Sequence, residues 1–408
     1  MNERTWQPGV YTRVPYWVFR DADVYEREQE RIYRGATWTF LCLEAEISKP
    51  GDYRTVSLGD MPVIVVRDDD GAIHAFENRC VHRGALLAYD DGGNAASFTC
   101  VYHNWRYERT GKLKSVAFQR GVQGKGGMPK DFRLDAHGPK QLRVARLHGL
   151  VFGTLSAAAP ALEDFLSPQI VDRIGRVMHR PVEVIGRFKQ TLPNNWKLYL
   201  ENTRDSYHAS LLHVFFTTFR LNRLSQRGGL IVSPGGDHAV SFSALDKVAA
   251  AGAEYSAEKL RSDVEGFSLA DPSLLQGFDE FPDGVTLQVV SVFPGFAIAH
   301  VRNTLAVRRI VPRAVDRTDL YWTYMGYVDD TPEQRKARLK QLNLIGPAGF
   351  VSLEDGMIGG FIQRGIPGSA REEAIVEMGG DSTETQDTRA TEASIRGLWK
   401  AYRRYMEV

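Results

Sequence analysis

Two cysteines and two histidines fall within one short stretch of this chain. One residue separates Cys80 from His82, two residues separate Cys100 from His103, and residues 83–99 lie between the pairs. Two loops built in this way can bring two thiolates and two imidazoles to one metal centre, either a tetrahedral zinc or a [2Fe–2S] cluster whose outer iron carries histidines. Zinc hairpins more often space their ligands by about two to four residues, so the close first pair favours the cluster but leaves zinc open.

The charge balance bears on the class of partner. The 408 residues contain 51 Lys and Arg against 50 Asp and Glu, a formal net charge of +1. Nucleic acids and anionic membranes attract chains with a basic excess, so we expect neither partner. The chain has no run of about 18 apolar residues and no signal-peptide pattern. Its three cysteines are too few for a disulfide framework. We therefore expect a soluble protein of the cytoplasm, with Cys42 as a buried thiol.

Changes in residue composition and pattern along the chain predict three parts. Residues 22–35 alternate in charge and end at a glycine, which predicts a helix within an N-terminal helical segment, residues 1–36, that packs on the last domain. Residues 37–155 alternate short β-rich runs with Asp/Gly turn clusters, which predicts a small all-β domain. An alanine-rich linker ending at Pro160 opens the last domain, residues 156–408.

The last domain mixes helices with strands. We expect helices over residues 162–177, 194–213, 332–344 and 391–406, and strands over residues 285–293, 296–312 and 318–328. Three strands in succession favour an antiparallel meander, and antiparallel strands with segregated helices define the α+β class. The expected fold is therefore α+β, with a small all-β domain and a larger domain of antiparallel sheet and helices.

The neighbours of the two ligand pairs indicate a family. Arg-Gly follows the first pair and Asn-Trp follows the second. In this context the chain resembles the Rieske family, whose hallmark is C-x-H-R-G followed by C-x-x-H-x-W. The resemblance implies a Rieske [2Fe–2S] cluster, with Cys80 and Cys100 on the inner iron and His82 and His103 on the outer iron. Imidazole in place of thiolate raises the cluster's potential, so that it can accept electrons from a ferredoxin-like donor.

A second pair of histidines, His208 and His213, falls within the helix expected over residues 194–213. Residues five apart on an ideal helix point about 140° away from each other, so the two can share a metal only if the helix is broken or bulged there. Taken alone, they are compatible with two core histidines. The run N-W-K-x3-E-N-x2-D-x-Y-H-x4-H over residues 195–213, however, resembles the catalytic segment of Rieske aromatic-ring-hydroxylating oxygenases.

This second resemblance implies a mononuclear Fe(II) site. The family binds its iron through two histidines and one carboxylate, which leaves one face open for dioxygen. The ligands implied for this chain are His208, His213 and Asp355, the last from a segment over residues 346–363 that is similar to the family's third-ligand segment. Glu354, the adjacent residue, is the competing carboxylate.

Two further residues take their roles from the same resemblance. Asp205 would hydrogen-bond the imidazole of His208 and link it to His103 in the cluster of a neighbouring subunit. Such a link implies a head-to-tail trimer. Asn202 would lie near the iron without binding it.

Together the two centres imply the oxygenase component of a multicomponent system. It would use O2 and electrons from NADH, delivered by an NADH-dependent ferredoxin-type reductase, to add both oxygen atoms to an aromatic ring and give a cis-diol. The resemblance also implies a helix-grip-like catalytic domain and a small β subunit in an α3β3 assembly. A Rieske electron carrier fused to a ligand-binding domain is the non-enzyme alternative.

The resemblance is greatest to large subunits that oxidise small aromatic carboxylates, with terephthalate dioxygenases first and salicylate hydroxylases and anthranilate dioxygenases as the alternatives. A dicarboxylate needs a cation at each end of an apolar slot, and an arginine fork binds a carboxylate in two places. Arg308 and Arg389 match positions that contact the carboxylates in terephthalate enzymes, and Arg389 is the residue that would distinguish a dicarboxylate. The apolar residues expected to line the slot are Phe215, Phe216, Val290 and Ile298.

Overall fold

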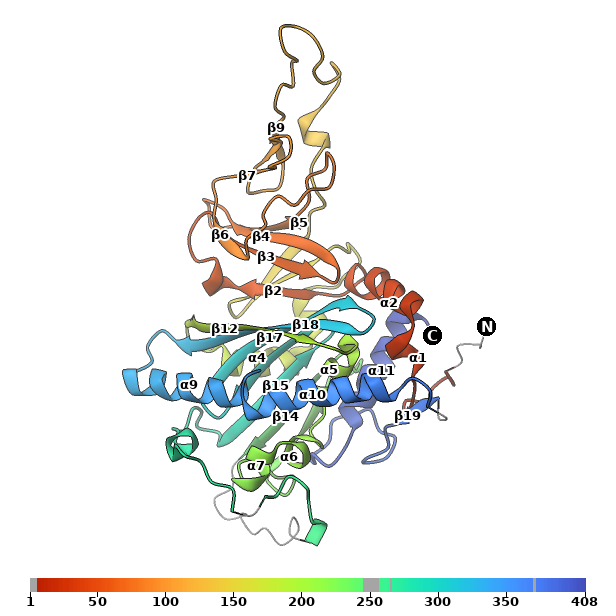
Figure 1. Cartoon of the computed structure of the whole chain (residues 1–408), viewed down its shortest axis with the longest axis vertical. Coiled ribbons are helices and arrows are strands. Elements are labelled where there is room, and N and C mark those ends of the chain that lie inside the picture. Colours follow the sequence, from red (N-terminus) through yellow and green to blue (C-terminus); the bar gives the residue numbers. More distant parts are fainter. Residues whose placement is uncertain (1–5, 245–256, 265, 370–371) are drawn as a thin grey trace. The chain divides into compact units, whose positions relative to one another are not determined.

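The computed structural model describes residues 6–244, 257–264, 266–369 and 372–408. It divides into a small unit, Tyr33–Pro160, and a large unit, Met1–Ile32 together with Ala161–Val408 (Figure 1). Within the described residues, no helix is long and apolar enough to cross a membrane.

The small unit is all β, apart from two short 3-10 turns, η2 (Glu44–Glu46) and η3 (Leu134–Ala136). Three antiparallel sheets build it. The first has the order β5-β4-β3-β6, formed by β3 (Asp52–Leu58), β4 (Met61–Arg67), β5 (Ile73–Glu77) and β6 (Gly92–Asn94). The second has the order β10-β11-β2, formed by β2 (Thr39–Leu43), β10 (Arg143–Leu147) and β11 (Leu150–Thr154). The third has the order β7-β8-β9, formed by β7 (Phe98–Thr99), β8 (Arg106–Tyr107) and β9 (Leu113–Ser115). Cys42 lies buried in β2, as expected of a packed thiol.

The large unit is built on a seven-stranded antiparallel sheet with the order β12-β18-β17-β16-β15-β14-β13. Its strands are β12 (Val182–Leu192), β13 (Gly228–Val232), β14 (His238–Ala244), β15 (Val285–Val292), β16 (Phe296–Val301), β17 (Thr304–Ala314) and β18 (Arg317–Tyr327). The short strands β1 (Arg13–Pro15) and β19 (Glu373–Ile375) pair separately. The antiparallel meander is confirmed. The single strand expected over residues 296–312 is wrong, because the sequence pattern does not mark the turn between two apolar runs. The chain turns at Arg302, whose φ is +54°, and forms the two paired strands β16 and β17.

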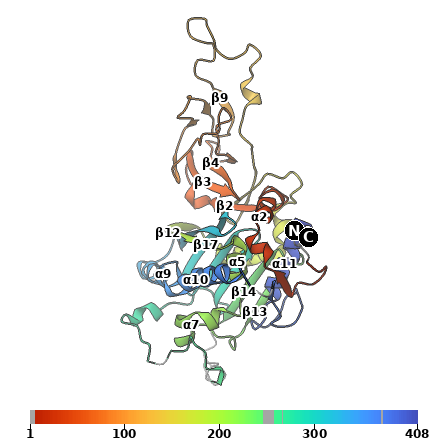
Figure 2. The ribbon, with the colours of Figure 1, turned by 45° about the vertical axis from the view of Figure 1, so that its right-hand side comes forward.

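Helices flank this sheet. They are α1 (Trp17–Arg20), α2 (Ala22–Glu28), which continues as a π-helical turn η1 (Gln29–Tyr33), α3 (Leu162–Leu166), α4 (Pro168–Val177), α5 (Trp196–Asn202), α6 (Ala209–Leu212), α7 (Val214–Thr218), the 3-10 turn η4 (Pro272–Leu275), α9 (Pro332–Ile345), α10 (Phe350–Gly365) and α11 (Ala393–Met406). Figures 1 and 2 show α9 and α10 running across the sheet, with α5 beside α10.

The continuous helix expected over residues 194–213 is wrong, because α5 ends at Asn202 and α6 begins at Ala209. Asp205 ends the helical path: its Oδ1 accepts hydrogen bonds from the backbone N–H groups of Tyr207, at 2.7 Å, and His208, at 3.1 Å. An aspartate that bonds its own backbone in this way competes with the helix for those donors.

A buried polar cluster anchors α5 to the N-terminal helix. The Glu28 carboxylate of α2 accepts hydrogen bonds from the Trp196 indole at 2.7 Å, the Lys197 ammonium at 2.6 Å and the Tyr402 hydroxyl at 2.6 Å. All four side chains are essentially excluded from solvent. A buried charge is tolerated when it is paired and fully hydrogen-bonded, so this cluster fixes the helix from which the site residues begin.

The two faces of the sheet have different partners. On one face, Gln288 of β15 donates to the carbonyl of Arg173 in α4 at 3.0 Å. On the other face, Ser291 contacts Thr203, directly after α5, at 2.9 Å. Because side chains alternate between faces along a strand, residue parity decides whether a side chain points toward α4 or toward α5.

Candidate metal centres and substrate slot

The two thiol–imidazole loops of the small unit have the same shape. In each, the cysteine carbonyl accepts a hydrogen bond at 2.9 Å from the residue four positions on, Gly84 in the first loop and Asn104 in the second. Both residues adopt positive φ, +81° and +53°, a conformation that glycine and asparagine tolerate best. The R-G and N-W sequences that follow the ligand pairs therefore supply the residues that close these loops.

The side chains of these loops fit an iron–sulfur centre. Cys80 and Cys100 are buried, and the His82 and His103 rings lie 4.6 Å apart between centroids. The buried His103 Nδ1 has no hydrogen-bond partner among the described residues. Burial raises the pKa of the Cys80 thiol, and the Tyr107 hydroxyl, 3.2 Å from its sulfur, only partly offsets this. A cationic centre would stabilise the thiolates that burial disfavours.

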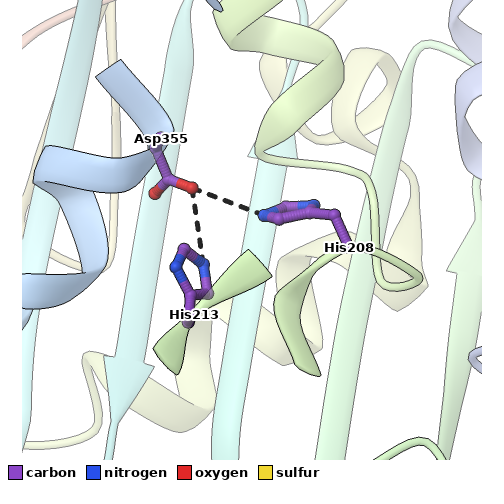
Figure 3. Close-up of side chains that lie close together, drawn as sticks. All are labelled: His208, His213 and Asp355. Carbon is purple, nitrogen blue, oxygen red and sulfur yellow. Dashed lines mark ion pairs between the residues drawn. The ribbon is translucent and has the colours of Figure 1, made fainter. Parts of the chain in front are cut away.

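A second group of ligand atoms gathers in the large unit. His208, His213 and Asp355 each offer one atom, and these atoms lie within 4.8 Å of one another (Figure 3). Asp355 Oδ1 is 3.4 Å from Nε2 of each histidine. His208 directly precedes α6, His213 lies between α6 and α7, and Asp355 lies on α10. The interruption after Asn202 is what allows two histidines five apart to face the same point.

Each histidine of the trio is backed by a further carboxylate. Asp205 Oδ2 lies 3.2 Å from Nδ1 of His208, and Glu354 Oε2 lies 2.8 Å from Nδ1 of His213. The Nε2 atoms are thereby left facing Asp355, which is the arrangement of metal-binding histidines whose other nitrogen is oriented by an acidic partner. Glu354, the competing ligand on sequence grounds, thus lies behind His213 and not within the trio. Its position next to Asp355 in the sequence could not distinguish these two placements.

Asn202 contacts the same centre. Its Nδ2 lies 3.3 Å from His208 Nε2 and donates to Asp355 Oδ1 at 3.0 Å. Because it contacts both His208 and Asp355, Asn202, the last residue of α5, bridges the two chain segments that supply the trio.

The electrostatics of the trio favour a cation. Burial on its own lowers the pKa of His208, but the carboxylates of Asp205 and Asp355 outweigh it and raise that pKa to about 10. Burial likewise opposes ionisation of Asp355, yet the two imidazoles hold the pKa of its carboxyl at about 2. A largely buried centre with two imidazole nitrogens and one carboxylate oxygen, in which positive charge is favoured, fits Fe(II) bound by a facial triad.

An apolar slot opens beside the trio, on the face of the sheet that points toward α5. Its lining includes Phe216, Ser241, Leu287, Val289, Val301, Arg308, Trp322, Ile345 and Val351, along with the trio, Asn202 and Asp205. The Arg308 guanidinium lies 4.4 Å from the centroid of the Trp322 ring and donates to the Tyr199 hydroxyl at 3.3 Å. The buried Nε of Arg308 and Nε1 of Trp322 have no hydrogen-bond partner within the described residues.

The apolar residues expected in the slot divide by position. Phe216 lines it and meets the His213 ring edge-on at 5.5 Å, whereas Phe215 packs in the core beside it. Val290 and Ile298 are paired across β15 and β16 on the face that points toward α4, so they do not line the slot. Val289 and Leu287, the alternate residues of β15, line the slot instead. Because β15 is apolar on both faces, the sequence does not reveal which set of alternate residues faces the slot.

Arg389 is buried before α11 and is not among the lining residues of the slot. Its guanidinium donates to the side chain of Asn222 and to the carbonyl of Arg223, both beyond α7. Its own carbonyl accepts from Ser206 at 2.8 Å, in the segment between α5 and α6.

Comparisons with known families agree with these two centres. Residues 37–124 match the Rieske [2Fe-2S] domain, and residues 178–408 match the ring hydroxylating alpha subunit (catalytic domain). The chain therefore belongs to the ring-hydroxylating alpha-subunit family of Rieske non-haem iron dioxygenases. It has a Rieske [2Fe–2S] domain and a candidate mononuclear iron site at the trio. Family membership sets aside the zinc site and the simple electron carrier.

Individual relatives are similar along nearly their whole lengths. The chain is 57% identical to subunit alpha 2 of the terminal oxygenase component of terephthalate 1,2-dioxygenase from Comamonas sp, over 98% of this chain and 97% of that one. It is 43% identical to the anthranilate 1,2-dioxygenase large subunit from Burkholderia cepacia, over 97% and 93% of the two chains. The structure of naphthalene 1,2-dioxygenase from Rhodococcus sp. bound to indole shares the fold, with a TM-score of 0.80 at 22% identity over 97% of this chain and 94% of that one.

Proposed function

We propose that this chain is the oxygenase component that cis-dihydroxylates an aromatic carboxylate, with terephthalate as the first candidate. The observation that carries the proposal is the trio of His208, His213 and Asp355, which lines an apolar slot together with Arg308. The 57% identity to a terephthalate 1,2-dioxygenase subunit supports the choice of substrate.

In this proposal Cys80, His82, Cys100 and His103 hold the [2Fe–2S] cluster, and the trio holds Fe(II). When bound, the cluster supplies single electrons and the mononuclear iron supplies the activation of O2 for ring dihydroxylation. The protein holds the ligands in place. Asp205 and Glu354 orient the two histidines from behind, and the apolar wall of the slot keeps water from the ring.

Arg308 is the residue that we assign to a substrate carboxylate. It is 7% exposed, and the partners of its guanidinium within the described residues are the Tyr199 hydroxyl and the Trp322 ring, with no carboxylate among them. A buried guanidinium without a counter-ion is costly, and a bidentate substrate carboxylate would offset that cost. The second carboxylate of terephthalate would have to reach Arg389, whose guanidinium already donates to Asn222 and Arg223.

That engagement of Arg389 favours a second candidate, a monocarboxylate. Anthranilate is then the leading alternative, supported by the 43% identity to an anthranilate 1,2-dioxygenase large subunit, and salicylate hydroxylation on the same metals is the other. Arg308 would bind the single carboxylate in either case.

Partners also belong to the proposal. We expect electrons from NADH through a ferredoxin-type reductase, a small β subunit in an α3β3 assembly, and a contact between Asp205 of one copy and His103 of the next. The carboxylate of Asp205 faces the imidazole of His208, which is the position that such a link requires.

A single turnover tests the reaction and the substrate together. Iron-loaded, chemically reduced protein is mixed with O2 and, separately, terephthalate, phthalate, anthranilate, salicylate or benzoate, and the products are identified by mass. A gain of two oxygens and two hydrogens on terephthalate supports the first candidate. Catechol from anthranilate, or a one-oxygen product from salicylate, would move the assignment to that substrate. No product from any of them, with three irons per chain, would refute the substrate class.

A further inference from the structure

Tyr199 contacts the cation of the slot and shares a cavity wall with residues of the trio. It is on α5, it is 1% exposed, and its hydroxyl accepts a hydrogen bond from Arg308 NH1 at 3.3 Å. Tyr199 lines a second cavity, of about 660 Å³, whose wall also includes Asn202, His208 and Asp355. Those three residues line the slot as well, so Tyr199 forms part of the partition between the two spaces.

The contact with Tyr199 is one of two that hold the Arg308 guanidinium in place. The guanidinium rests on the Trp322 ring, its cross-strand neighbour, which fixes the plane of the fork. The Tyr199 hydroxyl is the side-chain oxygen that receives one of its N–H groups. Arg308 therefore has a flat support and one lateral restraint, and its remaining donors are available to a ligand.

The tyrosine is held as a neutral phenol. Burial raises the pKa of Tyr199, the nearby Asp355 carboxylate adds to that rise, and the Arg308 guanidinium opposes it. A neutral hydroxyl that accepts from Arg308 keeps its own proton to donate, on the side of α10, the helix packed against α5. The hydroxyl thus has Arg308 on one side and Ser352 of α10 on the other.

We propose that Tyr199 is a positioning residue for substrate. It fixes the fork of Arg308, so that a carboxylate bound there places the aromatic ring at a defined distance from the trio. This inference rests on the proposed function and deepens it, because it makes the Tyr199–Arg308 pair the device that recognises an aromatic carboxylate. Productive geometry is sensitive to displacements of about 1 Å, so a loose fork would lower product yield as well as affinity.

The test is a double-mutant cycle of Tyr199→Phe and Arg308→Gln on iron-loaded protein. Binding of benzoate and of neutral benzamide is measured by calorimetry, and product formed per O2 consumed is measured at saturating substrate. Tyr199→Phe should weaken benzoate binding roughly tenfold, leave benzamide binding within about twofold and lower the product yield, because one hydrogen bond to a charged group is lost. In the Arg308→Gln background, the same substitution should change benzoate binding by less than about twofold.

Tyr327→Phe is the matched control. It removes another buried phenol, which donates to the Val177 carbonyl at 2.9 Å on the α4 side of the same sheet, and it should leave both ligands unaffected. Equal losses for Tyr199→Phe in both backgrounds, or equal losses for benzoate and benzamide, would overturn the positioning role. Wild-type protein that binds benzoate no better than benzamide would overturn the proposed function itself, which is a separate and distinguishable result.

Discussion

Glu354 offers the sharpest test of how the iron site is built. Its Oε2 lies 2.8 Å from Nδ1 of His213, and its Oε1 accepts from the backbone N–H of Val214 at 3.4 Å. The carboxylate therefore fixes both the ring of His213 and the first turn of α7. Replacing Glu354 with alanine removes the partner of Nδ1 and leaves the ring free to rotate, whereas glutamine keeps an oxygen that can accept from the same nitrogen.

The magnitude follows from the role of such partners. Removing a carboxylate or carbonyl that orients a metal-binding histidine typically lowers metal affinity by about 10- to 100-fold, or roughly 1.4–2.7 kcal/mol. Because the Glu354 side chain is only 16% exposed and the contact is short, we expect Glu354→Ala near the upper end of that range. Glu354→Gln should lose less, since it removes the charge but keeps the acceptor.

The assay is a titration of apoprotein with Fe(II) against a competing chelator. The visible absorption of the [2Fe–2S] cluster serves as the internal reference, because the cluster ligands lie in the small unit and should keep their occupancy. Leu353→Ala, an exposed neighbour on the same helix, is the matched control and should bind Fe(II) like the wild type. Unchanged affinity in Glu354→Ala would refute the orienting role, and a total loss of iron in both Glu354 variants would instead make Glu354 a ligand.

Three further outcomes are expected. Asp205→Asn should keep both metals yet lose nearly all electron transfer between them, measured by rapid mixing of reduced protein with substrate and O2; normal turnover contradicts the link to a neighbouring cluster. For a substrate whose second carboxylate reaches Arg389, Arg389→Ala should weaken terephthalate binding by more than benzoate binding; equal losses would favour the monocarboxylate candidate. Burial lowers the pKa of His238 to about 4, so this ring is neutral in the fold, and the unfolded state takes up the proton first as the pH falls below 6.5. The free energy of unfolding should therefore drop by roughly 2 kcal/mol from this residue between pH 7.5 and 5, checked by urea titration; His238→Gln should lack that part of the drop.

The sequence is sufficient to select the candidate metal-binding side chains, because ligand spacing is a local property. The C-x-H and C-x-x-H pairs and the H-x4-H pair fix which side chains can meet a metal, and family resemblance connected Asp355 to them over a long separation. The residues that line the slot are harder to predict from the sequence. Val290 and Val289 are equally apolar in the sequence, and only the pairing register of β15 with β16 decides which of the two faces the trio. The sequence leaves Glu354 as an alternative to Asp355, and the structure separates the two because helix geometry places adjacent residues on different sides of α10.

Asp205 explains why α5 ends at Asn202, although the sequence pattern predicts a helix that continues to His213. One carboxylate oxygen accepts from the backbone of Tyr207 and His208, and the other faces the imidazole of His208. The same side chain therefore ends the helical path and orients the ring that the break makes available. An asparagine keeps an oxygen for the backbone donors and loses only the charge, whereas an alanine loses both functions. If Asp205→Asn keeps iron at the trio while Asp205→Ala loses it, the local backbone structure and the electrostatic role of this residue are separable, and the metal depends first on the backbone turn.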